Sequence, residues 1–328
     1  MIAARPRAAF YCMSSRIYFL GAVGMINSLR LVGHREPIFL LDCGLTPEQR
    51  ELLQPHVTLV PAPGGTKPFL LKTIAPLEHP AEVMVLIDAD MIVTRSLSGL
   101  IARASCGFVI GIENNMDRFV PDWGDLLGLG PIRRRRYLSS GLVFLGGSPG
   151  QKVLRLMDDR LRRVEYQRGY LARNEPDYPL LYLDQDVLNA ILSTRMESDR
   201  VVGLEARSAL LPPFRGLRVV DEERVRCVYD DGTEPYVVHQ LLPQKPWLEP
   251  IYDGVYSRLL RRSLAGSDVA IRVPRREIPI RLRTGVLAYA ERQRVKARDQ
   301  FRWRLGGIAP RRRARADELR RQRAASRL

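Results

Sequence analysis

The sequence predicts an α/β fold in which a parallel sheet carries helices on both faces. Short apolar runs rich in β-forming residues alternate with segments whose apolar residues recur at helical spacing. Strands and helices that alternate in this way form βαβ units, whose crossovers place the helices against the sheet. The chain has 328 residues, of which 45% are hydrophobic, and this suffices for one large domain or two smaller ones.

Individual elements follow from local patterns. The expected strands are Ala8–Cys12, Pro37–Leu41, Val57–Val60, Met84–Ile87, Phe108–Ile112 and Leu142–Leu145. The expected helices are Tyr18–Val32, a segment that begins after Thr46, Gln151–Gln167 and Gln185–Thr194. Gly33 ends the first helix, while Thr46 caps the second and Pro47 occupies its first position. The segment 114–136 is too long and irregular for a simple connection, so we expect a functional loop there.

The most informative stretch is Val85-Leu86-Ile87-Asp88-Ala89-Asp90. In an α/β sheet the carboxyl end of a strand opens into the ligand crevice, and here such an end carries two carboxylates. Carboxylate oxygens on a rigid backbone suit a hard divalent cation, which in turn neutralises a diphosphate. The simpler alternative is a polar strand end or a helix cap, and a second Asp-X-Asp triplet, Asp184-Gln185-Asp186, weakens the pattern taken alone.

The charge is concentrated in the last quarter of the chain. The net charge is +16, and residues 255–328 hold 22 Lys and Arg against 6 Asp and Glu. Residues 1–254 hold 30 of each sign, so the body is neutral and the tail carries the whole excess. We therefore expect the tail to be either a separate module or a solvated arm.

The four cysteines indicate a reducing compartment. Cys12, Cys43, Cys106 and Cys227 are scattered and have no metal-like spacing, so we expect ordinary core thiols in a cytoplasmic protein. No stretch approaches the ~20 apolar residues that span a bilayer. Arg5 and Arg7 before an apolar region only faintly imitate a signal peptide, since Arg16 interrupts the pattern.

Four segments in order resemble the metal-dependent glycosyltransferases of the GT-A fold, and family 8, with glycogenin and bacterial lipopolysaccharide sugar transferases, is the best match. The segments are 87–90 (IDAD), 137–144 (YLSSGLVF), 183–189 (LDQDVLN) and His239 through Lys245-Pro246-Trp247. The resemblance spans roughly residues 8–250. It implies a Rossmann-like mixed sheet flanked by helices. The nucleotide-binding half would cover about 1–112 and the acceptor half about 113–254, with the basic tail at 255–328.

The resemblance implies a metal centre and a donor site. Asp90 and His239 would bind Mn²⁺ or Mg²⁺ directly, and Asp88 would share metal and ribose contacts. Lys245 would supply a positive charge to the diphosphate, whereas the alternative is a surface lysine beside a turn proline. Lys72 would be a basic residue that faces the nucleotide sugar. The alternative, a lysine on a solvated helix face, accounts for its place in the sequence equally well.

The sugar side is implied in the same way. Asp184 would accept hydrogen bonds from donor hydroxyls, and Gln185 would lie near the anomeric carbon. The alternative for Asp184 is that it only caps the helix that follows it. Ser139 stands where the family usually has Asn, and Met13-Ser14-Ser15-Arg16 replaces the Asp that often reads uracil. The base and the sugar of the donor therefore stay open.

Two basic segments have competing interpretations. The run 133–136 (RRRR) would contact an anionic acceptor or donor phosphate, or it is a solvated loop. In the tail, Val255, Leu259 and Leu260 alternate with arginines at helical spacing, and Phe301 and Trp303 lie among further arginines. This pattern is typical of a peripheral membrane segment at the inner face of the membrane. Nucleic-acid binding needs the same charge, but no nucleic-acid-binding motif accompanies it, and disorder is the third possibility.

The predicted function is transfer of a sugar from a nucleoside diphosphate donor to an acceptor hydroxyl on a glycan or a lipid-linked molecule. Retention of anomeric configuration is implied by the resemblance alone. Two alternatives remain open at this point. One is a sugar-1-phosphate nucleotidyltransferase, which would normally show a Gly-rich basic signature after the first strand. The other is a basic anchoring protein that has lost catalysis.

Overall fold

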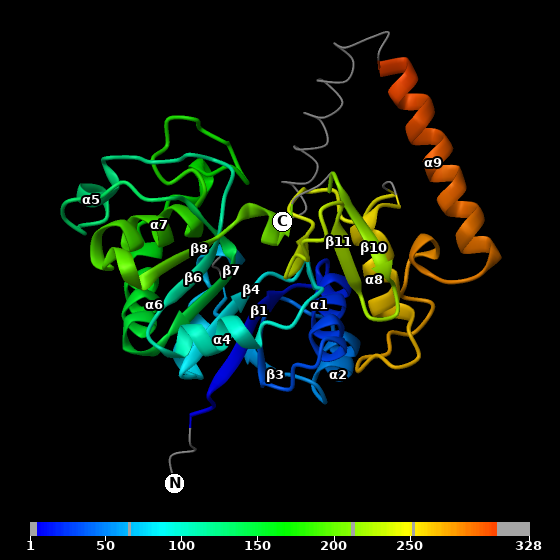
Figure 1. Cartoon of the computed structure of the whole chain (residues 1–328), viewed down its shortest axis with the longest axis horizontal. Helices are drawn as coiled ribbons and strands as arrows, with labels where there is room; N and C mark the ends of the chain where they lie inside the picture. The colour runs from blue at the N-terminus through cyan, green and yellow to red at the C-terminus, as the bar shows by residue number, and fades with distance from the viewer. Residues whose placement is uncertain (1–4, 65–66, 211–213, 251–252, 307–328) are drawn as a thin grey trace.

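The architecture is a seven-stranded mixed sheet between two layers of helices (Figure 1). A computed structural model describes residues 5–64, 67–210, 214–250 and 253–306. The strand order is β3-β2-β1-β4-β7-β6-β8. The strands are β1 (Ala8–Ser14), β2 (Ile38–Asp42), β3 (Thr58–Pro61), β4 (Val83–Ile87), β6 (Val109–Glu113), β7 (Leu138–Gly146) and β8 (Val201–Leu204).

The sheet is parallel only in part. Strands β1 to β4 pair in parallel, as the alternating pattern predicts, but β7 runs antiparallel to both β4 and β6. The purely parallel sheet expected from the alternation is therefore wrong at β7, and the mixed sheet implied by the family resemblance is confirmed. Strand periodicity does not encode direction, so the apolar run of β7 carries no signal that could have distinguished the two.

Both faces of the sheet are buried, which explains why its strands read as continuous apolar runs. Alternate residues of one strand enter different cores: Phe10 and Cys12 of β1 join the first, and Ala9 and Tyr11 join the second. The first core contains α1 (Phe19–Leu31), α4 (Ser98–Ser105) and α8 (Val255–Ala265). The second contains α3 (Ile74–Glu78), α6 (Gly147–Leu161) and α7 (Asp184–Arg195).

A local signal places the start of α2 (Pro47–Leu53) correctly, whereas both ends of α6 differ from the prediction. Thr46 caps α2 in a capping box with Gln49, as its sequence predicts. The loop 114–136 is long and contains only the short helix α5 (Trp123–Leu126). The helix expected at Gln151–Gln167 begins earlier, at Gly147, and ends at Leu161, before a separate 3₁₀ turn at Tyr166–Arg168.

A second, three-stranded sheet extends the site beyond β4. Its strands are β5 (Met91–Val93), β12 (Val237–His239) and β9 (Ala209–Leu210), with β12 antiparallel to β5 and parallel to β9. The antiparallel hairpin of β10 (Leu217–Asp221) and β11 (Arg226–Tyr229) packs against α8. The register pairs His239 with Met91, so this small sheet brings two distant parts of the chain together just after the Asp-Ala-Asp triplet.

The first part of the basic tail belongs to the body of the protein. Tyr256, Leu259 and Leu260 of α8 are at most 1% exposed and pack in the first core against α1. The expectation that Leu259 and Leu260 face a membrane is therefore wrong. An apolar helical stripe has the same periodicity whether it faces a core or a lipid surface, so the pattern could not separate the two.

The chain continues through a 3₁₀ turn, η5 (Ile280–Leu282), into α9 (Val286–Gly306), which projects from the body (Figure 1). Among the described residues, no helix combines the length and the apolar character needed to cross a membrane. The four cysteines form no disulfide, and Cys12 and Cys227 are buried as expected, whereas Cys106 is exposed.

Candidate active site

The three predicted metal ligands meet at the carboxyl end of β4. Asp88 and Asp90 lie in the turn between β4 and β5, and His239 ends β12. The backbone fixes this turn, because Asp88 N–H donates to Gly141 O (2.9 Å) and Gln240 N–H donates to Asp90 O (3.0 Å). One ligand atom from each of Asp88, Asp90 and His239 lies within 4.8 Å of the other two.

Asp90 is the most heavily paired of the three. Its Oδ1 lies 3.1 Å from His239 Nε2, and its Oδ2 accepts a hydrogen bond from Lys245 Nζ at 2.5 Å. Asp90, His239 and Lys245 are each at most 9% exposed. Burial alone would raise the pKa of Asp90, but the charges of Lys245 and His239 outweigh burial and hold the pKa well below its usual range. Asp90 is therefore anionic, and Lys245 is its counter-ion.

Lys72 joins the metal side of the site to the sugar side. Its Nζ lies 3.0 Å from Asp88 Oδ1 and 3.0 Å from Asp184 Oδ2, and it donates to Ser140 O at 3.0 Å. Burial would lower the pKa of Lys72, but Asp184 and Asp88 together raise it. Contrary to the sequence-based expectation of a helix face, Lys72 lies in a turn just before α3. The residue is only 9% exposed, so the alternative of a solvated lysine is wrong.

Gly141 keeps space open beside the metal ligands. A Cβ placed on Gly141 would lie 2.7 Å from Met91 Cε, 3.0 Å from Asp88 Oδ2 and 3.0 Å from His239 Cε1. Asp88 Oδ2 is also the oxygen that Lys72 does not contact in an ion pair. Two carboxylates, an imidazole and an adjacent unfilled Cβ position fit Mn²⁺, or Mg²⁺ with fewer protein ligands. The residues present thus suit a divalent cation.

The predicted sugar-side residues belong to the same network. Gln185 Oε1 accepts from Ser140 N–H at 3.2 Å, and Ser139 Oγ accepts from Gly141 N–H at 3.3 Å. The N-cap position of α7 belongs to Leu183 and Asp184 is the first helical residue, so the alternative that Asp184 merely caps the helix is wrong. Asp184 Oδ2 is buried and, among the described residues, accepts no hydrogen bond of good geometry despite the nearby ammonium.

The second aspartate of the later triplet has a different task. Asp186 is fully buried and binds Arg118 (2.8 and 3.0 Å), Tyr137 (2.5 Å) and the backbone N–H of Tyr182 (2.8 Å). Both oxygens of its carboxylate are engaged in these hydrogen bonds. Asp186 therefore anchors the start of α7 to the 118–137 loop, which positions Asp184 and Gln185.

Two aromatic residues lie beside Lys245. Tyr18 was not among the predicted site residues, and Trp247 belongs to the predicted Lys245-Pro246-Trp247 segment but was given no role of its own. Tyr18 lies just before α1, and Lys245 Nζ stands 5.8 Å from the centre of its ring. Trp247 packs edge-on against Tyr18 (6.1 Å between ring centres) and donates from Nε1 to Ile17 O at 2.7 Å. The signal for Tyr18 was its place just after the carboxyl end of β1, at the same edge of the sheet as the acidic triplet.

A cavity of about 20 Å³ adjoins Lys72 and Asp88 at the ends of β1, β2 and β4. Its wall includes Met13, from the segment where the family often has an Asp. By contrast, the arginine run lies away from this cavity. Arg134 pairs with Asp117 (2.6 Å), Arg135 donates to Met196 O, and Arg136 pairs with Glu113 (3.3 Å). The side chains of Arg134 and Arg136 are 62% and 81% exposed, so both expectations for the run, a solvated loop and an anion contact, stay open.

Two solved glycosyltransferases have similar structures. The galactosyltransferase LgtC, in complex with donor and acceptor sugar analogues, matches with a TM-score of 0.53 at 14% identity, over 82% of this chain and 98% of LgtC. An active-site Gln-to-Glu variant of LgtC matches with the same TM-score and coverage at 12% identity. The bifunctional glycosyltransferase WbbM matches with a TM-score of 0.51 at 12% identity, over 82% of this chain and 50% of WbbM.

The chain has the GT-A fold. No family model matches the sequence, and a search of curated proteins found no match either. The structural similarity, with a TM-score of 0.53, establishes the fold. At identities of 12–14% it does not establish the chemistry, which is argued from the site. In this GT-A chain the acidic triplet, the histidine and the two lysines all meet at the carboxyl edge of the sheet, where ligands of α/β proteins bind.

Proposed function

We propose that the protein is a metal-dependent glycosyltransferase that moves a sugar from a nucleoside diphosphate donor to an acceptor hydroxyl. The observation that carries this proposal is the convergence of Asp88, Asp90 and His239 within 4.8 Å on a GT-A fold. The three residues come from segments about 150 positions apart, and buried lysines flank them. A cluster of this composition at a strand end suits a diphosphate held through a cation.

Asp88, Asp90 and His239 would hold Mn²⁺ or Mg²⁺. When bound there, the ion would offset the negative charge that the leaving diphosphate acquires as the glycosyl bond breaks. Lys245 contributes a second, fixed positive charge at the same place, because it is 2% exposed and tied to Asp90. Lys72 would supply a third charge toward the donor, next to the cavity at the ends of β1 and β2.

Asp184 and Gln185 would orient the transferred sugar. Asp184 Oδ2 pairs with the Lys72 ammonium at 3.0 Å, and a carboxylate oxygen with two lone pairs could accept a second hydrogen bond from a donor hydroxyl. Gln185 accepts a hydrogen bond from Ser140 N–H, and Ser139, the residue before Ser140 on β7, would contact the same sugar. LgtC also has a glutamine in its active site, which supports a functional place for Gln185. Retention of anomeric configuration is part of the proposal.

The acceptor would be a glycan or a lipid-linked molecule, and the protein would work in the cytoplasm, peripherally at the inner membrane face. Exposed apolar side chains on α9 support the membrane part: Val286 is 84% exposed, Leu287 81% and Phe301 63%. They lie among the arginines of a segment with a large positive charge. Trp303 falls within α9, but its side chain lies outside the described residues.

A thermal-shift panel tests the proposed function. The native protein is melted with UDP-, GDP-, ADP- and TDP-sugars, with and without Mn²⁺, beside Asp90→Ala measured against its own baseline. A ligand that binds the native state raises the melting temperature. We expect one donor class to raise it only with Mn²⁺, and we expect the variant to lose that response. No shift with any donor would favour a non-catalytic protein, while a metal-dependent shift with a nucleoside triphosphate alone would favour a nucleotidyltransferase.

The stereochemical part needs its own measurement. Once the donor is known, proton NMR of the first product formed, or of the sugar released by slow donor hydrolysis, reports the anomeric configuration directly. We expect the configuration of the donor. The opposite anomer would show inversion and would require a carboxylate base near the acceptor.

A further inference from the structure

The loop that carries Lys245 lies between the site and the C-terminal segment. This loop, residues 240–250, connects β12 to α8 and contributes no strand to either sheet. On its inner side Lys245 binds Asp90, and Trp247 donates to Ile17 O. The loop's own backbone bonds are few, with Leu248 N–H and Glu249 N–H both donating to Lys245 O at 3.0 Å. Two side-chain hydrogen bonds within the loop add to these, from Gln240 Nε2 to Gln244 O (2.9 Å) and from Lys245 Nζ to Gln240 O.

Arginines from the C-terminal segment bind the outer side of this loop. Arg281 of η5 donates from Nε to Pro246 O at 2.7 Å, and Arg298 of α9 donates to Pro250 O at 2.7 Å. Pro246 follows Lys245 directly, and a residue before proline is restricted to extended conformations. The carbonyl of Pro246 belongs to the peptide between Pro246 and Trp247. Because the proline ring fixes φ of Pro246 and restricts Lys245, holding this carbonyl also limits where the Lys245 side chain begins.

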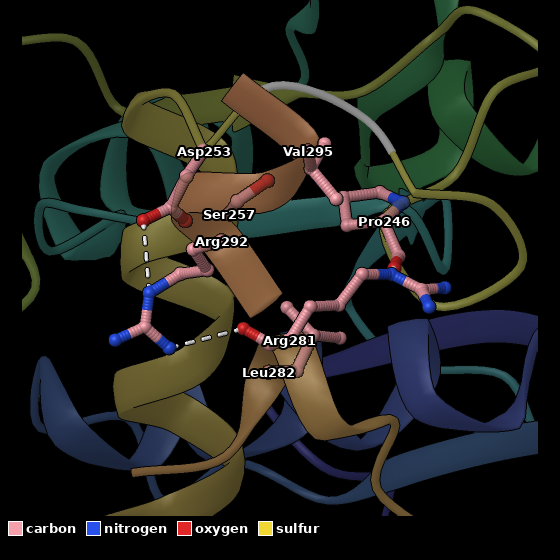
Figure 2. Close-up of a pocket in the computed structure, with 7 residues that line it drawn as sticks. All are labelled: Pro246, Asp253, Ser257, Arg281, Leu282, Arg292 and Val295. Atoms are coloured by element: carbon pink, nitrogen blue, oxygen red, sulfur yellow. Dashed lines mark hydrogen bonds and ion pairs between the residues drawn. The ribbon is translucent and has the colours of Figure 1, made fainter. Parts of the chain in front are cut away.

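Arg292 holds Arg281 in place. Its Nη1 donates to Arg281 O (3.2 Å) and Arg283 O (3.1 Å), and its Nε lies 3.5 Å from Asp253 Oδ2 (Figure 2). The same aspartate pairs with Arg261 of α8 at 2.9 Å. Figure 2 shows Arg292, Asp253 and Arg281 among the residues around a small cavity, with Arg281 reaching toward Pro246. The volume of this cavity is about 10 Å³. The turn η5 is thus held by Arg292 of α9, which also contacts the aspartate that pairs with α8, while Arg281 of η5 binds the loop.

We propose that Arg281 is a positioning residue for Lys245 and that the C-terminal segment from η5 into α9 forms part of the framework of the active site. The catalytic consequence rests on the proposed function, since it assumes that the Lys245 ammonium meets a diphosphate. The structural half does not. Arg281 holds the loop so that the ammonium stays at Asp90, and loosening this bond lets Lys245 leave the site.

Hydrogen exchange of the full-length protein, followed by mass spectrometry, tests the structural half without any ligand. In Arg281→Gln we expect the protected amides of Leu248 and Glu249 to exchange roughly tenfold faster, because one charged hydrogen bond no longer holds the loop. Peptides from β4 and α1 should exchange as in the native protein. Arg272→Gln is the matched control, since Arg272 is exposed and donates to Ser267 O within its own segment.

Unchanged exchange across 240–250 in Arg281→Gln would overturn the proposal. Equal acceleration over the whole chain would overturn it as well, because Arg281 would then support only global stability. Arg281→Lys should restore much of the protection, as an ammonium can still donate to Pro246 O. A second readout is reductive methylation of Lys245, which should be faster in Arg281→Gln than in Arg272→Gln.

Activity separates this proposal from the proposed function. With the donor found by thermal shift, Arg281→Gln should lower kcat at least several-fold with a smaller change in the donor KM, because Lys245 acts mainly on the leaving group. If the native protein transfers no sugar, the proposed function fails, and exchange still decides whether Arg281 positions the loop. If kcat is unchanged although exchange in the loop rises, the positioning role in catalysis is contradicted.

Discussion

Asp90 has two roles, because it would bind a cation and it neutralises the buried Lys245. Replacing it with Asn leaves Lys245 charged, 2% exposed and without its partner. Breaking a buried pair from one side costs about 3 kcal/mol. We therefore expect Asp90→Asn to lower the free energy of unfolding by about that amount in urea titrations at pH 7.

The double variant separates the lost pair from other effects. Lys245→Met removes the stranded charge, so Asp90→Asn with Lys245→Met should be more stable than Asp90→Asn alone. A double variant that is as unstable as the sum of the two single variants would show that the ion pair contributes nothing to folding.

The same pair fixes the sign of a pH effect. The folded protein holds the pKa of Asp90 below its unfolded value, so the stabilisation is fully present above about pH 4, the usual pKa of an unfolded Asp, and it is lost as the pH falls below that. The stability gap between native protein and Asp90→Asn should consequently shrink between pH 5 and pH 3 in urea titrations. A gap that widens over this range would contradict the assigned charge state.

Gly141 tests whether space beside the ligands matters. Gly141→Ala would force a Cβ to within 3.0 Å of Asp88 Oδ2 and His239 Cε1. We expect a loss of about 1–3 kcal/mol in stability and weaker Mn²⁺ binding by isothermal titration. The control is Gly99→Ala in α4, where a Cβ meets nothing within 4 Å and a helical alanine should stabilise by up to about 1 kcal/mol. Unchanged Mn²⁺ affinity in Gly141→Ala would remove Gly141 from the site.

At the residue scale, the sequence predicted the ligands better than their partners. Asp88, Asp90, His239 and Lys245 stand in recognisable local patterns, and the structure brings these four residues together. The ion pair between Lys72 and Asp184 joins positions over a hundred residues apart, and the same ammonium also pairs with Asp88. No local pattern encodes such a contact, which is why Lys72 could not be told from a solvated lysine.

At the scale of elements, the ambiguous case is the amphipathic helix. The stripe of α8 faces the protein core, whereas the start of α9 presents its apolar residues to solvent. The period of 3.6 residues predicts a helix in each case but says nothing about what covers its apolar face. Strand direction is a similar case, since β7 reads as a buried strand in either orientation.

Two leucines separate these roles. Leu260 of α8 is fully buried, and Leu287 of α9 is 81% exposed. We expect Leu260→Ala to cost about 2–5 kcal/mol in urea unfolding. Leu287→Ala should change the free energy of unfolding by less than about 0.5 kcal/mol and should weaken binding to anionic vesicles. Equal effects of the two substitutions on stability would contradict the separate roles of α8 and α9.

At the scale of the whole molecule, the boundary of the folded body differs from the boundary in charge. The charge changes at residue 255, but α8, which follows it, is part of the core. Removing 255–328 would delete buried α8 residues, so that truncation would unfold the protein before it could report on a membrane. A stop after residue 306 removes eight arginines and two acidic residues and leaves all the described elements intact. We expect this shorter protein to fold and to bind phosphatidylserine vesicles less tightly at low salt.

Salt is the control for that comparison, because charge attraction to the vesicle weakens as ionic strength rises. Vesicle binding that is the same with and without residues 307–328, at every salt concentration, would show that these residues do not contact the membrane.

The proposed glycosyl transfer depends on the centre formed by Asp88, Asp90 and His239. The most direct test is a titration with Mn²⁺, alone and with UDP, GDP, ADP and TDP, in which electron paramagnetic resonance counts the free ion. Native protein should bind one ion, His239→Ala should bind it far more weakly while keeping its fold, and the exposed-site control Asp122→Ala should bind as native. Equal Mn²⁺ binding by His239→Ala and native protein, or none by native protein with any nucleotide, would contradict the metal centre.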